Sequence, residues 1–199
     1  MAGFTLAEML MVVAVLTIVT GAIFRQIGMA QKNYRAESQK LDFTEQQRTF
    51  ADQFTRDLRQ AGYPTALSMG PGAAANQVAS GNLVINPAGT SLTMEGDLDG
   101  SGIVQVVTYD YNAATGSLER TASQKGLAVN PPLTIVQNVL PPVANPPLFQ
   151  PCDATGNCAP NPIGAVKSVR VNFTLQGTND ARMPAIQTTM TATARLPNF

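Results

Sequence analysis

The stretch that decides the fold is GFTLAEMLMVVAVLTIVTGAIF, residues 3–24, in which Glu8 is the only ionisable side chain. As a helix rising about 1.5 Å per residue, the apolar run 4–24 reaches about 30 Å, the thickness of the hydrocarbon core of a bilayer. A secretory signal needs a basic start and a small-residue cleavage site after the run, whereas Arg25 follows it directly. A core helix this uniformly apolar needs a much larger domain around it. The run therefore predicts a transmembrane helix over residues 4–24.

Glu8 is a carboxylate inside this apolar run, where a charge costs a few kcal/mol. One interpretation is that its side chain reaches the membrane interface, since it lies close to the chain start. In the other, cleavage after Gly3 gives Phe4 a new ammonium group, four residues from Glu8 and on the same helix face. Because a buried amine and a buried carboxylate each need a counter-charge, copies of such a helix could then pair between subunits.

The residues GFTLAE, 3–8, resemble the processing site of type IV prepilins and type II secretion pseudopilins. The resemblance implies that a prepilin peptidase removes a leader, residues 1–3, by cutting after Gly3, and methylates the new N-terminal Phe4. It implies that Glu8 guides assembly into a filament. It also implies a single-pass protein of the bacterial inner membrane, with a cytoplasmic N-terminus and an exported C-terminal domain, which then joins a pilus or pseudopilus filament.

The charges around the apolar run depart from the family pattern. Family leaders usually carry Lys or Arg before the cleavage glycine, whereas Gly3 follows only Met1 and Ala2. Basic residues instead follow the run, so the positive-inside rule taken alone predicts the opposite orientation. They are Arg25, Lys32 and Arg35.

Residues 25–61 continue the helix as an amphipathic stalk. Apolar residues recur mostly at steps of three, four or seven, which predicts a stripe packed onto a globular domain; they are Ile27, Tyr34, Leu41, Phe43, Phe50, Phe54, Leu58 and Ala61. Proline is absent from Phe4 to Ala61, and Gly62 and Pro64 end the helix. Asp57, between Arg56 and Arg59, is expected to form a solvated or capping cluster. The segment FTRDLRQAGYP, 54–64, resembles the end of this helix in PilW-type minor pilins and PulJ/GspJ-type pseudopilins.

The rest of the chain predicts a loop over 62–81 and a C-terminal antiparallel sheet domain over 82–199, with a proline-rich insertion at 131–162. Strand signals are NLVIN (82–86), SLTME (91–95), IVQVVTYDY (103–111), LTIVQNV (133–139), AVKSVRVNFTLQ (165–176) and IQTTMTATARL (186–196). Their alternation fits one sheet with an apolar side covering the helix, which is an α+β fold and the pilin architecture. GDLDGSG, VTYDYN, GSLER and TATARLPN also resemble the PilW/PulJ group.

DLDGSGIV, 97–104, is compatible with either a calcium loop or a tight Asp/Gly turn. Asp97, Asp99 and Ser101 fall at the first, third and fifth loop positions, and Ile103 would offer a carbonyl oxygen. Thr108 stands where the bidentate glutamate of a calcium loop belongs, so the turn is favoured. No cofactor other than this calcium ion is expected.

Cys152 and Cys158 enclose DATGN, and without His or a further Cys they are too few ligands for a zinc site. An exported domain predicts a disulfide between them, and a cytoplasmic domain predicts two free thiols.

The amino-acid composition reduces the number of function classes to be expected. The chain has 13 Lys and Arg against 13 Asp and Glu and no His, so we expect neither a nucleic-acid partner nor an enzyme. The resemblance implies a PilW-like minor pilin acting in pilus assembly or tip initiation, or a PulJ/GspJ-like pseudopilin of type II secretion. Its partners would be other pilins, the prepilin peptidase and an inner-membrane assembly platform. A pilus-displayed adhesin or DNA-binding module is the alternative, and a basic or aromatic patch would favour it.

Overall fold

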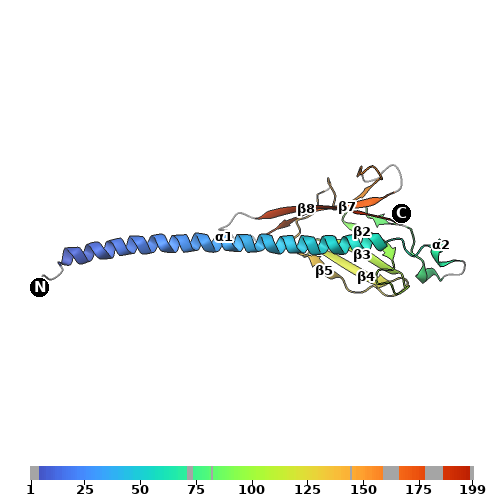
Figure 1. Cartoon of the computed structure of the whole chain (residues 1–199), viewed down its shortest axis with the longest axis horizontal. Coiled ribbons are helices and arrows are strands. Elements are labelled where there is room, and N and C mark those ends of the chain that lie inside the picture. Colours follow the sequence, from blue (N-terminus) through green and yellow to red (C-terminus); the bar gives the residue numbers. More distant parts are fainter. Residues whose placement is uncertain are drawn as a thin grey trace.

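A single long helix, α1 (Leu6–Gln60), dominates the structure, and its first part projects from a domain built of β-strands (Figure 1). The computed structural model describes residues 5–70, 74–81, 83–143, 145–158, 166–177 and 186–197. Two short helices, α2 (Ala66–Met69) and the 3₁₀ helix η1 (Ala75–Gln77), lie within the region predicted to be a loop.

The ends of α1 follow from local chemistry. At its start the hydroxyl of Thr5 accepts a hydrogen bond from the Glu8 backbone N–H, and the Glu8 carboxylate accepts one from the Thr5 N–H, which together form a capping box. At its end Gly62 has φ +79°, a conformation that favours glycine. Gly96 of the sheet lies so close that an added Cβ would be 2.5 Å from the carbonyl oxygen of Gln60. The helix end is therefore held directly against a strand.

The first sheet is an antiparallel meander of five strands in the order in which they follow one another along the chain. They are β1 (Val84–Ile85), β2 (Ser91–Gly96), β3 (Gln105–Asn112), β4 (Ser117–Gln124) and β5 (Leu133–Val136). A second antiparallel sheet has the order β6 (Phe149–Cys152), β7 (Ser168–Gln176) and β8 (Gln187–Arg195).

These elements confirm the predicted α+β class but correct the prediction of one sheet to two. Strand β4 was not among the strand signals, because Leu118 is its only large apolar residue. Strand β6 was missed because it contains Pro151 and lies in the stretch 131–162, which was interpreted as an insertion. That stretch supplies β5, which the strand signal at 133–139 predicts, to the first sheet, and β6 to the second.

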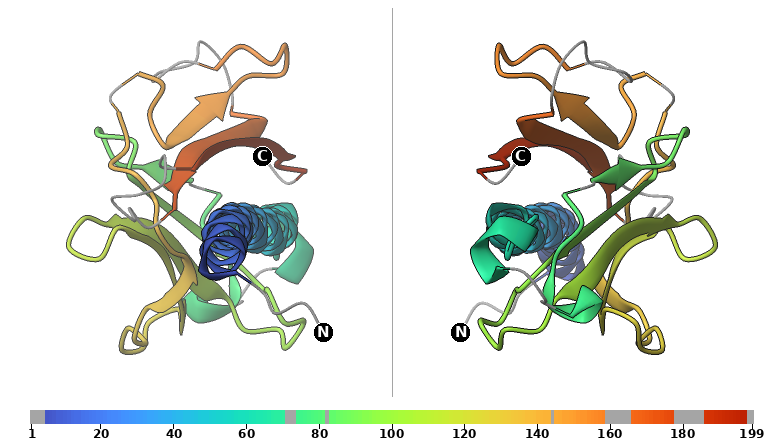
Figure 2. Two further views of the ribbon diagram at one scale, coloured as in Figure 1. Left: turned by 90° about the vertical axis from the view of Figure 1, so that its left-hand side faces the viewer. Right: turned by 90° about the vertical axis from the view of Figure 1, so that its right-hand side faces the viewer.

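The two sheets lie on different sides of the second part of α1, as the end-on views show (Figure 2). Phe50 and Phe54 of the helix are fully buried between them. The ring of Phe50 lies 6.0 Å from that of Tyr109 in the first sheet and 5.3 Å from that of Phe173 in the second, centroid to centroid. The ring of Phe54 lies 5.4 Å from Tyr109 and 6.1 Å from Phe149. One pair of helix side chains therefore holds both sheets.

The predicted stalk stripe is in fact two separate stripes. Residues from Phe43 onward form the buried one, whereas Ile27, Tyr34 and Leu41 are 46%, 77% and 68% exposed. Tyr34 and Phe43 are nine residues apart in the sequence, about two and a half helical turns, so they point to opposite sides of α1. The prediction that Ile27, Tyr34 and Leu41 pack on the chain's own domain is therefore wrong.

We expect Phe54→Ala to lower the free energy of unfolding by about 3–5 kcal/mol, since it removes a fully buried ring shared by both sheets. Tyr34→Ala, on the exposed side of the same helix, should change it by less than about 0.5 kcal/mol. Urea unfolding of the detergent-solubilised chain measures both. Equal effects would contradict the packing described above.

Candidate functional site

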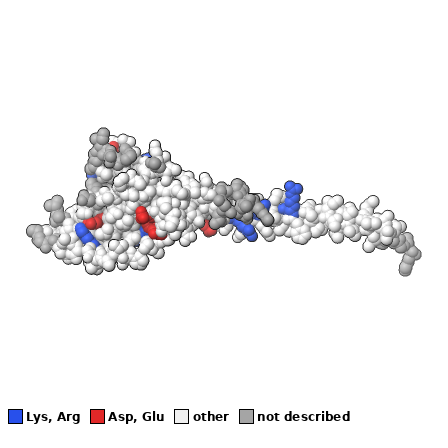
Figure 3. Space-filling view, turned by 180° about the vertical axis from the view of Figure 1, so that it is seen from behind, with Lys and Arg blue, Asp and Glu red and all other residues white. Residues whose placement is uncertain are grey.

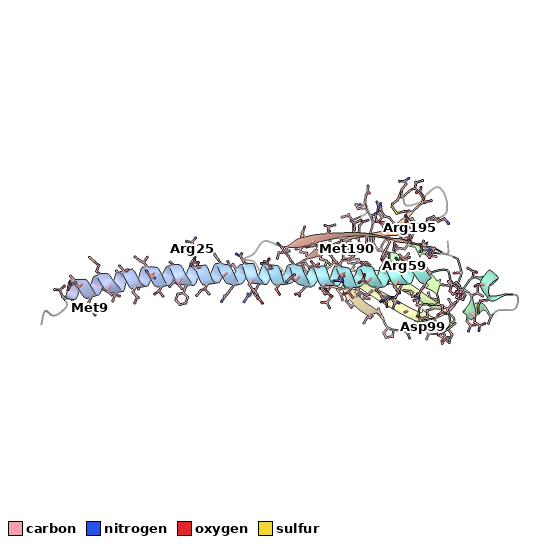
Figure 4. All side chains as sticks on the ribbon, viewed as in Figure 1. Met9, Arg25, Arg59, Asp99, Met190 and Arg195 are labelled. Atoms are coloured by element: carbon pink, nitrogen blue, oxygen red, sulfur yellow. A yellow bond between two sulfur atoms is a disulfide. The ribbon has the colours of Figure 1, made fainter. Side chains whose placement is uncertain are left out.

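The first part of α1 has the length and composition to cross a membrane, and it is the only helix of the described residues that does. No other described part of the chain buries its apolar window. The face in view in Figure 3 carries no charged side chain over the outer part of this helix. Figure 4 labels Met9 near its start and Arg25 just beyond the apolar run. The hydroxyl of Thr17 donates to the carbonyls of Val13 and Ala14, so this polar group is satisfied within the helix.

Glu8 is the one charged residue on this apolar surface. Its Oε2 accepts hydrogen bonds of 2.9 Å from both the backbone N–H and the hydroxyl of Thr5. The carboxylate therefore lies at the N-terminal end of the helix, where free backbone N–H groups favour negative charge. Along one strip of surface Glu8 is followed by Met11, Val12, Val15, Leu16 and Val19.

The other two residues of the predicted processing site, Gly3 and Phe4, lie outside the described residues. The chain places Phe4 directly before Thr5, whose backbone N–H already contacts the Glu8 carboxylate. Processing at Gly3 and pairing of Glu8 with an amine both stay predictions.

A polar cluster that sequence analysis misjudged lies at the other end of α1. Asp57 is buried, 1% exposed, rather than solvated. Its Oδ2 accepts hydrogen bonds from the Tyr109 hydroxyl at 2.6 Å and from the Arg120 Nε at 2.7 Å, and its Oδ1 accepts one from the Gln53 Nε2 at 2.8 Å. The position of Asp57, three residues after Phe54, would have placed it beside the buried stripe, but the neighbouring arginines suggested solvent.

The electrostatics of this cluster favour one set of charges. Burial, together with the negative charge of Asp57, raises the pKa of the Tyr109 hydroxyl, so it stays protonated and donates. Burial alone would lower the pKa of Arg120, but the hydrogen bond and the charge of Asp57 outweigh it and raise that pKa. Asp57 and Arg120 thus form an ion pair between α1 and β4, with Tyr109 of β3 as a neutral donor.

A second ion pair fastens the segment that follows α1 to the first sheet. Lys125 Nζ lies 2.7 Å from Glu95 Oε2 and donates to the carbonyl of Val78 at 3.0 Å, while Glu95 accepts the Ser80 backbone N–H at 2.7 Å. Burial opposes the ionised form of Glu95, but the hydrogen bonds from Lys125 and Ser80 outweigh it and lower its pKa.

The loop 97–104, whose sequence is compatible with a calcium site or a tight turn, forms a turn held by its own hydrogen bonds. The Asp97 carboxylate accepts the Gly102 N–H at 3.0 Å, and the Asp99 carboxylate accepts the Ser101 N–H at 3.0 Å and the Gln105 side chain at 2.9 Å. Ser101 Oγ accepts the Ile103 N–H at 3.4 Å. The hydrogen bond from Ser101 lowers the pKa of Asp99. Among the described residues no three Asp, Glu or Cys side chains gather in a possible metal cluster, and calcium binding stays a prediction.

A disulfide joins Cys152 and Cys158, the bridge predicted for an exported domain. The enclosed loop is ordered by Asp153, whose Oδ1 accepts from the backbone N–H and hydroxyl of Thr155 and from the Asn157 N–H. The hydrogen bond from Thr155 lowers the pKa of Asp153. The Cys152 end of the bridge is buried at the last residue of β6, so the bridge anchors this loop to the second sheet.

No family model matches the chain, and neither a curated protein nor a solved structure matches it.

We expect Asp57→Ala to destabilise the chain by about 3–5 kcal/mol, because it leaves the Arg120 cation without its counter-charge and the Tyr109 hydroxyl without an acceptor. Asp52→Ala, an exposed site on the same helix, is the matched control and should cost less than about 0.5 kcal/mol. Urea unfolding at neutral pH compares them. An Asp57 variant as stable as the Asp52 variant would show that the cluster does not hold the helix.

The pKa of Glu95 is lowered in the folded state, so its contribution to stability is fully present above its unfolded pKa of about 4.3. This contribution is lost as the pH falls through the lower, folded-state pKa. We expect Glu95→Gln to lower the free energy of unfolding at neutral pH. We also expect the variant to lose less of that free energy than the parent chain as the pH falls from neutral to acidic. Unfolding curves measured between neutral and acidic pH test this. An equal loss in the variant and the parent chain would contradict it.

Proposed function

We propose that this chain is a membrane-anchored structural subunit of a pilin-type filament, namely a PilW-like minor type IV pilin that takes part in pilus assembly or tip initiation. The observation that carries the proposal is the difference in burial between the two parts of α1. Its second part is enclosed by two sheets, and its first part is apolar, uncovered and carries Glu8 at its start. A subunit that must leave a bilayer and pack beside similar helices needs such an exposed helix.

The mechanism is physical rather than catalytic. A prepilin peptidase cuts after Gly3, and the new amine of Phe4 places a cation at the start of the apolar helix, four residues from Glu8. In a helix bundle that excludes water, Glu8 of one subunit neutralises the amine of a neighbour, because unpaired charges there are costly. The sheet domain stays on the exported side, where the disulfide between Cys152 and Cys158 is stable.

The stripe beyond the apolar run supports helix packing outside the bilayer as well. Ile27, Tyr34 and Leu41 are spaced by seven residues and lie on the side of α1 away from its own domain. A seven-residue repeat is the spacing at which two helices keep one seam in contact. Other pilins, docked on the assembly platform of the inner membrane, are the partners we propose for this seam.

The second candidate within the same class is a PulJ/GspJ-like pseudopilin of type II secretion, since the features named above serve either filament. Deletion of the gene, with separate assays of piliation and of protein export, distinguishes the two. Loss of pili with normal export supports the minor pilin, and the reverse result supports the pseudopilin. A deletion strain with intact filaments and normal export would contradict both.

We expect Glu8→Ala to remove most of the protein from the sheared filament fraction, because the amine of the neighbouring subunit would then be unpaired in an apolar bundle. Glu37→Ala, an exposed carboxylate on the same helix beyond the apolar run, is the control and should be incorporated normally. Immunoblots of filament and membrane fractions measure the distribution. Intact mass spectrometry of the mature chain should show methylated Phe4 as its first residue, and retention of Met1–Gly3 would overturn the proposal.

A further inference from the structure

The two sheets of the described chain end in four border strands, which differ in how well they are protected. Strand β1 has 2 residues, and β5 has 4 and follows Pro131 and Pro132. Strand β6 also has 4 residues and contains Pro151, and its Phe149 N–H donates to the Gly89 carbonyl. Strand β8 has 9 residues, none of them proline. Proteins usually protect border strands by shortness, proline, charge or a covering element. Strand β8 is neither short nor interrupted by proline and carries no charge before Arg195, and α1 packs against it.

The hydrogen-bond register shows which backbone groups of β8 are turned outward. The Gly177 N–H donates to Ile186 at one end of the ladder, and the Leu196 N–H donates to Lys167 at the other. Because bonded pairs alternate in an antiparallel ladder, the even-numbered residues 188–194 bond to β7. The odd-numbered residues therefore direct their N–H and C=O groups away from β7. They are Gln187, Thr189, Thr191, Thr193 and Arg195, and all five are exposed.

In the part of the chain that the structure describes, β8 has a strand neighbour, β7, on one side only. From Gln187 to Ala194 the strand has no charged residue, and Arg195 at its end is its only one. On the side facing the core, Met190 and Ala192 are only partly buried. A strand added beside β8 could place apolar residues at alternate positions next to Met190 and Ala192 and so bury them further. Small polar residues at its remaining positions would lie beside the exposed threonines on the opposite face of the sheet.

The position of β8 restricts what can be added. Figures 1 and 2 show it alongside α1 at the border of its sheet, and among the described residues no further strand pairs with its outer side. The strand begins near Gln39, against which Gly177 lies, and Figure 4 labels Arg195 at the end near Arg59. It therefore runs in the same direction as α1. Antiparallel pairing of two β8 strands would point their helices in opposite directions, which two copies anchored in one membrane cannot do.

We propose that the free border of β8 binds an extended segment of a different polypeptide, which adds as an antiparallel strand with apolar residues alternating toward Met190 and Ala192. The affinity comes from backbone hydrogen bonds to residues 187–195, and the alternating side chains supply the selectivity. This surface lies on the sheet domain, so the proposal does not depend on Glu8, on processing at Gly3 or on which filament is built.

The test uses a proline substitution at an outward-facing position. Thr191→Pro removes an N–H that does not bond to β7, so the β7–β8 ladder is kept, whereas Thr191→Ala removes the side chain and keeps the N–H. The probe is a fluorescent peptide, SVRVNFTLQ, which copies β7, the antiparallel neighbour that β8 already accepts. We expect it to bind the full chain in detergent and its Thr191→Ala variant alike. Thr191→Pro should weaken binding at least about tenfold, since one backbone hydrogen bond is lost and the ring obstructs the border.

Urea unfolding shows whether Thr191→Pro folds, and if it does not, Thr193→Pro is used in its place. A peptide of the same composition in scrambled order controls for non-specific apolar binding. A photo-crosslinker at Thr189, introduced in the native host, should join β8 to a different polypeptide, and Thr191→Pro should abolish that product. Absence of peptide binding, equal binding by the proline and alanine variants, or crosslinks only between copies of this chain would each overturn the proposal.

Discussion

The contact on which the rest of the structure depends is the insertion of Phe50 and Phe54 between two sheets. Their rings meet Tyr109 from the first sheet and Phe149 and Phe173 from the second, and the helix side chains are fully buried. Neither small sheet could bury its apolar side without this helix, because each would leave one face open to water. The domain is thus assembled around the second part of α1, and no other described segment covers the apolar first part.

Asp57 gives this apolar contact a defined geometry. Apolar packing tolerates small rotations of a helix, whereas a buried carboxylate must meet its donors at hydrogen-bond distance. The bonds from Tyr109 and Arg120 therefore fix the rotation of α1 about its own axis relative to β3 and β4. That rotation decides which side of the projecting helix faces away from the domain, and so where Ile27, Tyr34 and Leu41 are displayed.

The same molecule therefore presents two kinds of unsatisfied surface. The projecting helix offers apolar side chains, which a bilayer or another helix can cover. The border of β8 offers backbone donors and acceptors, which water or an added extended strand can pair. The two surfaces call for different partners, so occupation of one leaves the chemistry of the other unchanged. A structural subunit with both could join a helical bundle and still recruit a further protein at its sheet domain.

The sequence by itself determined the long helix, its apolar first part, its end near Gly62 and the antiparallel strands, because these depend on local periodicity and on residues adjacent in the chain. The disulfide was also foreseeable from Cys152 and Cys158. Tertiary structure alone decided which side of α1 the domain covers, that Asp57 is buried, and that the proline-containing segment Phe149–Cys152 forms a strand of the second sheet. The burial of Asp57 needed Tyr109 and Arg120, which are far away in sequence, to arrive from two strands. Local patterns cannot show this, since a carboxylate between two arginines is equally consistent with solvent until its distant partners are placed.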